Sequence, residues 1–338
     1  MMFRIVIGAV LALLGMQLAA KAQNTTRSTP KYLQSDALRA KDRINERPRY
    51  GGLTKTAAQL EADAQFLAQS LRQYGTAHAA MQAHVNFGWH YLATDHAPTA
   101  IKRFNQAWLL DSTAADVYYG FSAYLQQQGQ PEEAERFMQI GKRLDTGNAA
   151  LLKYYASQAY HQSLRRDYAG AIATNEQLLA LAPDNAFAHG RTGYWCLLQQ
   201  DTARAGQYLS RAVQLNPQDS VSYLNRGWLR YGQKQYPQAV ADFTQAIRIN
   251  AHYLSAYANR AVAHTDAGNH AAAIADLLQC LKLVPSRDKG PFYYLLAQAH
   301  LKTNDSHGAC EALRQALEWS YTPAAEKDIK RLMKSACR

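Results

Sequence analysis

The sequence predicts an all-α protein, a right-handed α-solenoid of about seven helix-turn-helix repeats that ends in a C-terminal capping helix. Three observations carry this prediction. First, 48% of the 338 residues are hydrophobic and only 10 are proline, so the chain can bury a core and has few helix breakers. Second, Ala, Gln, Leu and Tyr are common, and runs of β-branched residues are rare after the N-terminus. Third, small and large apolar residues recur about every 34 residues, a length that fits two antiparallel helices and two turns.

The first 22 residues have the order of a secretory signal peptide. Arg4 precedes an apolar run from Ile5 to Leu14, and Ala20-Lys21-Ala22 forms a small-residue cleavage site. The alternative is a retained membrane anchor, although this stretch is short for a span and contains Gln17. The pattern therefore predicts an exported protein, periplasmic or secreted, with no transmembrane segment after cleavage.

The positive charge of the chain is concentrated near its ends. The formal net charge is +11, of which residues 23–53 carry +4 and residues 322–338 carry +3, while residues 54–321 carry only +2. Residues 23–53 are polar, contain Pro and Gly, and lack an apolar period, which predicts a mobile or loosely docked basic segment. A nucleic-acid binder concentrates basic residues along a structured face, so this distribution argues against nucleic acid as a partner.

A solenoid needs a polar cap at each end, and the sequence offers two candidates. In residues 54–80, Thr56 and Gln59 match a capping box, and Gly75 ends the predicted helix. The apolar stripe of this N-terminal capping helix comprises Leu60, Ala64, Phe66, Leu67, Leu71 and Tyr74. In residues 323–338, a helix from Pro323 to Ala336 is predicted to cap the C-terminal end.

Between the caps, residues 81–322 repeat themselves seven times. One alanine recurs at intervals of 34, 37, 34, 34, 34 and 36 residues, as Ala100, Ala134, Ala171, Ala205, Ala239, Ala273 and Ala309. A small residue lies 12 positions before each, as Gly88, Ser122, Ala159, Gly193, Gly227, Ala261 and Ala297. Small residues at these sites let two helices approach closely, and the large residues between them fill the remaining space.

These sites resemble the tetratricopeptide repeat (TPR) family, whose 34-residue unit has the pattern W-x2-L-G-x2-Y, A-x3-F and P. The copy from Ser220 to Tyr253 carries the resemblance in Tyr223, Gly227, Tyr231, Ala239, Phe243 and Ala246. Copies three and seven depart from the pattern. Copy three has about three extra residues between its helices, which either lengthen a helix or bulge a loop.

The resemblance implies a binding face lined by the first helix of each repeat, where family members hold extended peptides or partner helices. Asn225 and Asn259 match a family ladder of asparagines that bind peptide backbone, and Arg191 occupies the same site one copy earlier. The aromatic candidates for this face are Tyr194, Trp228, Tyr231, Trp89 and Tyr119. The alternative is that the asparagines bond backbone between stacked helices and that the aromatics are core residues.

The four cysteines divide into two pairs. Cys196 and Cys280 fall at sites that the repeat pattern buries, which predicts core thiols. Cys310 and Cys337 lie on consecutive antiparallel helices, and export makes a disulfide between them plausible. The alternative is two separate thiols. No two cysteines are close in sequence, so the chain lacks the spacing of a cysteine zinc site.

No enzyme motif is present in the sequence. There is no G-x-S-x-G, H-E-x-x-H or phosphate-binding loop, and the 11 histidines are scattered. We therefore expect no catalytic residue, metal or cofactor. The leading hypothesis is a non-enzymatic exported scaffold that binds peptides or proteins in a concave groove. The alternatives are a structural component of an envelope or membrane-associated complex, docked through the basic termini, and an accessory domain of a separate enzyme.

Overall fold

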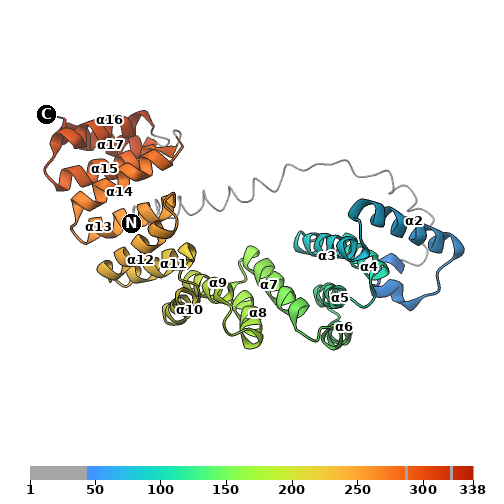
Figure 1. The fold of residues 1–338 in the computed structure, drawn as a ribbon. Coiled ribbons are helices and arrows are strands. Elements are labelled where there is room, and N and C mark those ends of the chain that lie inside the picture. The colour runs from blue at the N-terminus through green and yellow to red at the C-terminus, as the bar shows by residue number, and fades with distance from the viewer. Residues whose placement is uncertain (1–43, 286–287, 320–322, 338) are drawn as a thin grey trace. The chain divides into compact units, whose positions relative to one another are not determined.

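The structure is a computed structural model that describes residues 44–285, 288–319 and 323–337 (Figure 1). These residues form 16 α-helices and two 3-10 helices, and none of them lies in a β-strand. The fold class is therefore all-α, as predicted, and it is an α-solenoid built of helix hairpins. The predicted signal peptide, residues 1–22, lies outside the described residues.

The chain divides into two units, between Asp184 and Asn185. The N-terminal unit contains α2 Ala57–Tyr74, α3 Ala77–Ala93, α4 Ala97–Leu110, α5 Ala115–Gln127, α6 Pro131–Leu144, α7 Ala149–Leu164 and α8 Tyr168–Leu181. The C-terminal unit contains α9 Ala186–Leu198, α10 Thr202–Leu215, α11 Ser220–Gly232, α12 Tyr236–Ile249, α13 Leu254–Asp266, α14 His270–Leu283, α15 Gly290–Lys302, α16 Ser306–Glu318 and α17 Pro323–Ala336. The helices from α3 to α16 pair as seven consecutive hairpins, one for each sequence repeat.

The recurring small residues lie where the two helices of each hairpin cross. All seven recurring alanines are fully buried. Gly227 of α11 shows why the partner site must also be small: a Cβ atom there would lie 2.6 Å from the Phe243 ring of α12. Because the interior is close-packed, the large ring occupies the volume that the glycine leaves open.

The extra residues of copy three lengthen a helix. Helix α7 has 16 residues, whereas α9, α11 and α13 have 13 each. Of the two alternatives that the sequence left open, the structure therefore selects the longer helix.

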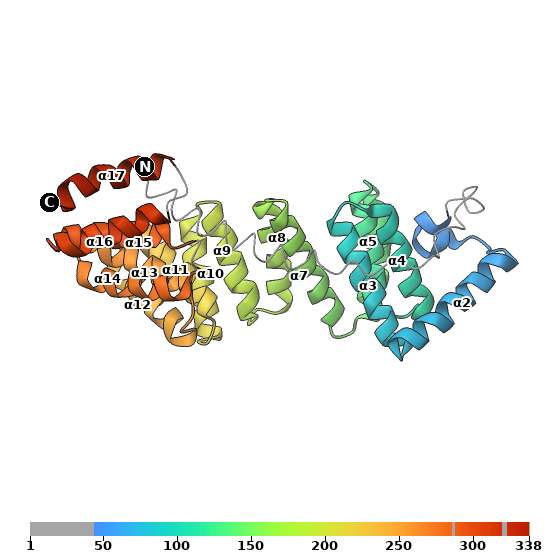
Figure 2. The same ribbon diagram turned by 90° about the horizontal axis from the view of Figure 1, so that it is seen from above.

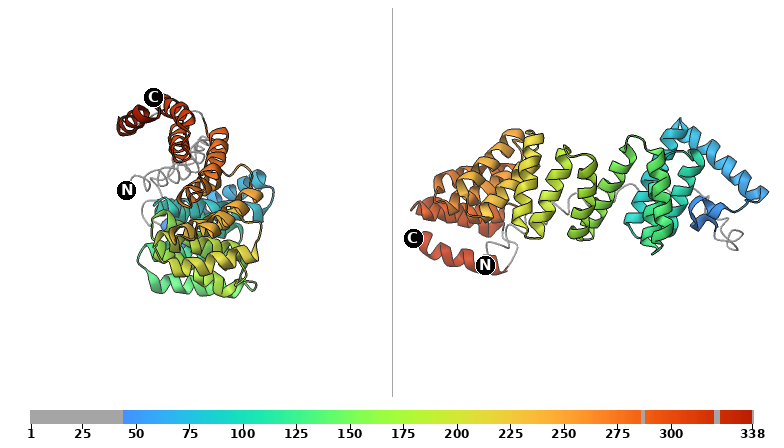
Figure 3. Two further views of the ribbon diagram at one scale, coloured as in Figure 1. Left: turned by 90° about the vertical axis from the view of Figure 1, so that its left-hand side faces the viewer. Right: turned by 90° about the horizontal axis from the view of Figure 1, so that it is seen from below.

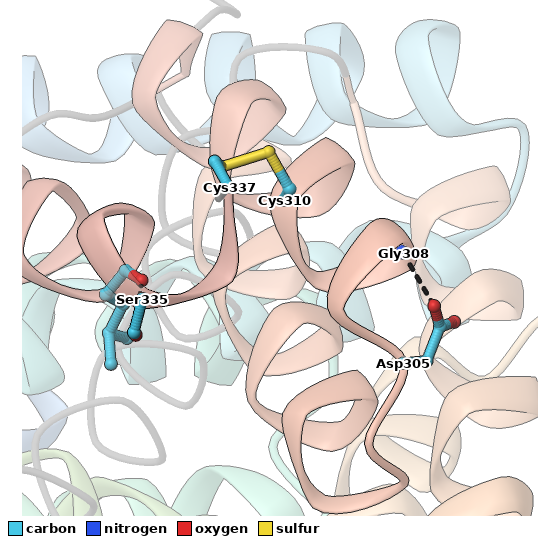
Figure 4. Close-up of a disulfide and its surroundings, with 6 residues drawn as sticks. Asp305, Gly308, Cys310, Ser335 and Cys337 are labelled. Carbon is cyan, nitrogen blue, oxygen red and sulfur yellow. Dashed lines mark hydrogen bonds between the residues drawn. A yellow bond between two sulfur atoms is a disulfide. The ribbon is translucent and has the colours of Figure 1, made fainter.

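The C-terminal cap is the amphipathic helix α17, which packs against α16 (Figures 2 and 3). Ile329 is its buried anchor, and the Tyr294 hydroxyl of α15 donates a hydrogen bond to Asp328 of α17. Cys310 of α16 and Cys337 form a disulfide with a Cα–Cα distance of 5.0 Å (Figure 4). The disulfide therefore ties the end of α17 to the last hairpin.

Residues 44–53 differ from the mobile or loosely docked segment that the sequence predicted. They form two 3-10 helices, Ile44–Glu46 and Pro48–Gly52, that pack on α4. The Asn105 side chain of α4 donates hydrogen bonds to the carbonyl oxygens of Asn45 at 3.2 Å and Arg47 at 2.9 Å. Tyr50 is buried and has a positive φ of 56°. The contacts with α4 therefore hold a left-handed turn that a non-glycine residue rarely adopts.

No helix among the described residues is long and apolar enough to span a membrane. The apolar run from Ile5 to Leu14 lies outside the described residues.

Candidate binding surface

The predicted binding residues of the C-terminal unit lie on three helices that follow one another in the stack. Helices α9, α11 and α13 are the first helices of consecutive repeats, and each contacts the next. Arg191, Asn225 and Asn259 occupy the same repeat position on these helices, at intervals of 34 residues. We call the side of α9, α11 and α13 that bears these residues the inner face of the C-terminal unit.

Asn225 and Asn259 are half-buried, and neither side chain forms a hydrogen bond within the described part of the chain. The alternative from the sequence was that these amides bond backbone between stacked helices, and that bond is not made here. Each amide therefore keeps one acceptor and two donors for a ligand. A peptide unit offers the complementary donor and acceptor.

An arginine directly after each asparagine anchors its helix. Arg226 donates two hydrogen bonds to Asp242 of α12, from Nε at 3.0 Å and Nη2 at 2.7 Å. Arg260 makes the same pair of bonds to Asp276 of α14, at 2.8 Å and 2.6 Å. These bidentate pairs fix the rotation of α11 and α13 about their axes, and with it the direction of the neighbouring asparagine.

Sequence reasoning missed these arginine–aspartate pairs, although the repeat contained a signal for them. Arg226 and Arg260 are 34 residues apart, and so are Asp242 and Asp276. Charges that recur together at the repeat period, on the two helices of one hairpin, indicate a pair that is built into the repeat.

Apolar side chains extend the inner face on α9 and α11. Tyr194 is 39% exposed, and Trp228 is half-buried. The sequence analysis missed Phe187 and Val221, which are 65% and 52% exposed and also lie 34 residues apart. The Arg191 guanidinium lies 4.8 Å from the centre of the Phe187 ring, in a cation–π contact. Such exposed apolar groups are suited to anchor contacts with a ligand.

Tyr231 is a candidate of this face whose hydroxyl already has a hydrogen-bond partner. Its hydroxyl donates a hydrogen bond of 2.6 Å to Asp266 at the end of α13. Burial, together with the hydrogen bond to this carboxylate, raises the pKa of Tyr231 above its usual value. Tyr231 therefore links α11 to α13.

In the N-terminal unit, Trp89 and Tyr119 pack with their own neighbours. Tyr119 is 0% exposed, so the sequence interpretation of this residue as a surface contact is wrong for this conformation. Its ring lies 5.5 Å from that of Tyr154, and its hydroxyl donates a hydrogen bond of 3.4 Å to Asp145. Trp89 is half-buried, with its ring 5.8 Å from Tyr154. The sequence does contain an indication that Tyr119 is buried, namely the glycine at position 141. A Cβ atom at Gly141 would lie 2.6 Å from the Tyr119 ring.

The described residues contain no group of three or more His, Cys, Asp or Glu side chains that could hold a metal ion. Cys196 and Cys280 are both buried thiols outside the disulfide. Burial raises the pKa of the Cys280 thiol, which keeps it protonated and unreactive.

The repeat sites and hairpins agree with a comparison of the sequence with protein families. Models described as "Tetratricopeptide repeat" match residues 157–220, 224–288 and 290–322. The chain is a tetratricopeptide repeat protein. The TPR family supports a role in protein–protein interaction, and the matched residues include Arg191, Asn225 and Asn259 of the inner face.

No curated protein matches the chain. Among solved structures, MamA is similar at 19% identity and a TM-score of 0.47, over 53% of this TPR protein and 94% of MamA. The type IV pilus biogenesis factor PilW has 15% identity and a TM-score of 0.48, over 64% and 98% of the two chains. PilF from Pseudomonas aeruginosa has 17% identity and a TM-score of 0.45, over 75% and 98%. Similarities this low carry no argument about function.

Proposed function

We propose that this TPR protein is a non-enzymatic scaffold that binds extended peptide segments of partner proteins on the inner face of its C-terminal unit. The observation that carries the proposal is the pair of asparagines at one repeat position, Asn225 and Asn259, whose amides have no hydrogen-bond partner among the described residues. A side-chain amide pairs with a peptide unit whatever the peptide sequence, so two in register favour an extended backbone.

The apolar part of the face supplies the second half of the recognition. Phe187 and Tyr194 are exposed on α9, and Val221 is exposed on α11 one helical turn before Asn225. A peptide held by its backbone at Asn225 and Asn259 would place apolar side chains against this region. Apolar burial would then provide affinity, while the amides would set the register of the backbone.

We also propose that the protein is exported and meets its partners in a periplasmic or extracellular space. The order of charge, apolar run and cleavage site in residues 1–22 supports this. The disulfide between Cys310 and Cys337 is compatible with an oxidising compartment.

An array of 12-residue peptides of varied sequence tests the binding face. The chain with both Asn225→Ala and Asn259→Ala should lose binding across most peptides, because the lost contacts are to backbone. Two lost amide contacts weaken binding by about 10- to 100-fold. Helix content and thermal unfolding should not change, because neither amide is bonded within the described residues.

The matched control removes two amides from the same repeats on the other helices. Gln238 of α12 and Gln279 of α14 are both exposed. The Gln238→Ala, Gln279→Ala chain should bind the array like the unmodified protein. Equal binding by the asparagine variant and this control would reject the inner face as the binding site.

A further inference from the structure

Helix α2 packs on the rest of the N-terminal unit through one side only. The Phe66 ring lies 5.1 Å from the His84 ring of α3, and Ser70 is buried. The neighbours of α2 in the unit are α3 and α4. Figure 2 shows α2 at the end of this unit, where a complete repeat would place one more helix beside it.

A second apolar stripe runs along the flank of α2 next to this packed side. Leu67 and Tyr74 of this stripe are half-buried, and the Tyr74 ring lies 6.1 Å from the His84 ring of α3. The residues of the stripe follow the alternating spacing of three and four that defines a heptad repeat, and they are Ala57, Leu60, Ala64, Leu67, Leu71 and Tyr74. We call this set the outer stripe. Leu60 is 57% exposed and Leu71 is 43% exposed, while Ala57 and Ala64 are exposed as well. A strict heptad stripe is narrower than the face of an ordinary amphipathic helix and fits one partner helix.

The outer stripe is complementary to itself when two copies run antiparallel. With a two-fold axis between residues 65 and 66, Leu60 faces Leu71 of the other copy, Ala64 faces Leu67, and Ala57 faces Tyr74. Two of these three layers place a small residue against a large one, which keeps the helices close and the layers filled. A parallel pair would instead place Ala64 against Ala64 and leave that layer thin.

The charges of α2 favour the same orientation. Glu61 lies in the first half of the helix, and Arg72 lies in the last turn on the same flank of the outer stripe. In an antiparallel pair, Glu61 of each copy lies close to Arg72 of the other. In a parallel pair, Glu61 and Arg72 of the other copy would lie on opposite sides of the contact, so they could not pair. An isologous contact of this kind uses one surface twice and closes as a dimer.

We propose that the outer stripe of α2 is the docking surface for a second copy of this chain, which pairs through an antiparallel α2–α2 contact. Helix α2 is already folded on α3, so association does not have to nucleate a helix. The stripe is less than three heptads long, so the dimer is expected to be weak, with a Kd on the order of 10 µM. Dimerisation would bring two inner faces together in one particle.

Sedimentation velocity across a dilution series of the full chain tests the dimer. The variant with Leu60→Ala and Leu71→Ala loses two leucine layers, because each substitution appears twice in a symmetric contact. Its Kd should rise by about 100-fold or more. The matched control is Leu164→Ala on α7, since Leu164 is also exposed, at 61%, and lies outside the stripe. This variant should dimerise like the unmodified chain.

Charge reversal and crosslinking test the orientation. Glu61→Arg should weaken the dimer, and the further change Arg72→Glu should restore it. Chains with Ala64→Cys mixed with chains with Leu67→Cys should form a mixed disulfide dimer, whereas neither variant should crosslink alone. Crosslinking of Ala64→Cys with itself would overturn the antiparallel arrangement.

Three outcomes would overturn the proposal itself. One is a full chain that stays monomeric at concentrations on the order of 100 µM. Another is a dimer that the Leu60→Ala, Leu71→Ala variant leaves unchanged. The third is a monomeric full chain that dimerises only when residues 1–43 are removed, because that result would assign the outer stripe to the chain's own N-terminal segment.

Discussion

The arginine–aspartate pairs of the C-terminal unit predict a ranked set of stabilities. Asp242 is buried on α12 and accepts three hydrogen bonds, two from Arg226 and one of 2.7 Å from Arg230 Nη1. Asp276 on α14 is equally buried but accepts only two, both from Arg260. The isosteric changes Asp242→Asn and Asp276→Asn remove the charge and keep the shape, so their costs report these contacts.

The loss in the free energy of unfolding for each change follows from how deeply the aspartate and its arginines are buried. Removing one member of a buried ion pair costs about 3–5 kcal/mol, because the other charge is left without compensation. The arginine heads are partly exposed and can recover some hydration by moving, which reduces the cost. We therefore expect about 2–4 kcal/mol for Asp242→Asn, which affects two arginines. We expect about 1–2 kcal/mol for Asp276→Asn, because Arg260 keeps its bond of 2.9 Å to Thr244.

The matched control is an exposed pair of the N-terminal unit. Arg165 Nη2 lies 2.6 Å from Asp95 Oδ1, and both side chains are largely exposed. Asp95 has a positive φ of 58°, which asparagine also tolerates, so Asp95→Asn changes only the charge. A solvated pair contributes about 0–1 kcal/mol.

Hydrogen exchange of each hairpin is the suitable assay, because a repeat array can open locally and need not unfold in one step. Asp242→Asn should raise exchange most in α11 and α12, and Asp276→Asn most in α13 and α14. The reasoning would fail if Asp242→Asn cost no more than the Asp95→Asn control. It would also fail if Asp276→Asn were the more damaging of the two buried changes.

Three further predictions concern other parts of the chain. Burial, helped by the nearby Arg103 charge, lowers the pKa of His84 to about 4. The pKa of this histidine in the unfolded chain is near 6.5, so the unfolded state binds the proton first as the pH falls. The free energy of unfolding should therefore decrease by up to about 3 kcal/mol between about pH 6.5 and 4. In urea unfolding curves measured over this pH range, His84→Leu should remove most of the decrease. Asn105→Ala should cost about 1–2 kcal/mol and raise hydrogen exchange in residues 44–53. Cys337→Ser should destabilise α17 by about 3–4 kcal/mol, measured by urea unfolding of the last hairpin. In a separate thiol count, the unreduced wild-type protein should show two reactive thiols when denatured.

The sequence was sufficient to predict the hairpins because each depends on residues that repeat. A small residue on the first helix and an alanine on the second mark each crossing, and every one of these alanines is fully buried. The capping box at Thr56 and Gln59 is also present, with Gln59 N bonded to Thr56 Oγ1 at 3.3 Å. These features are local or strictly periodic, so a single sequence contains them in full.

Residues 44–53 could not be predicted in the same way, because their contacts occur once and join distant parts of the chain. Asn105 contacts carbonyls 58 and 60 residues earlier, and it lies at a repeat position where nothing marks it as a docking residue. Tyr50 adopts a left-handed conformation that its residue type does not favour. Pro48 and the two glycines that follow Tyr50 suggested a loop, and they gave no indication of what the loop packs against.

Trp89 and Trp228 show why one repeat position does not determine a role. Each follows a recurring glycine on the first helix of its repeat, so the sequence pattern treats them alike. Trp89 packs against Phe104 at 5.4 Å and against Tyr154, whereas Trp228 has no ring contact among the described residues. The difference lies in the side chains that adjacent helices supply, and those vary from copy to copy. In a stack with nearest-neighbour contacts, the role of a residue at this position therefore depends on what the next repeats leave uncovered, and the proposed ligand contact of Trp228 needs its own test by substitution.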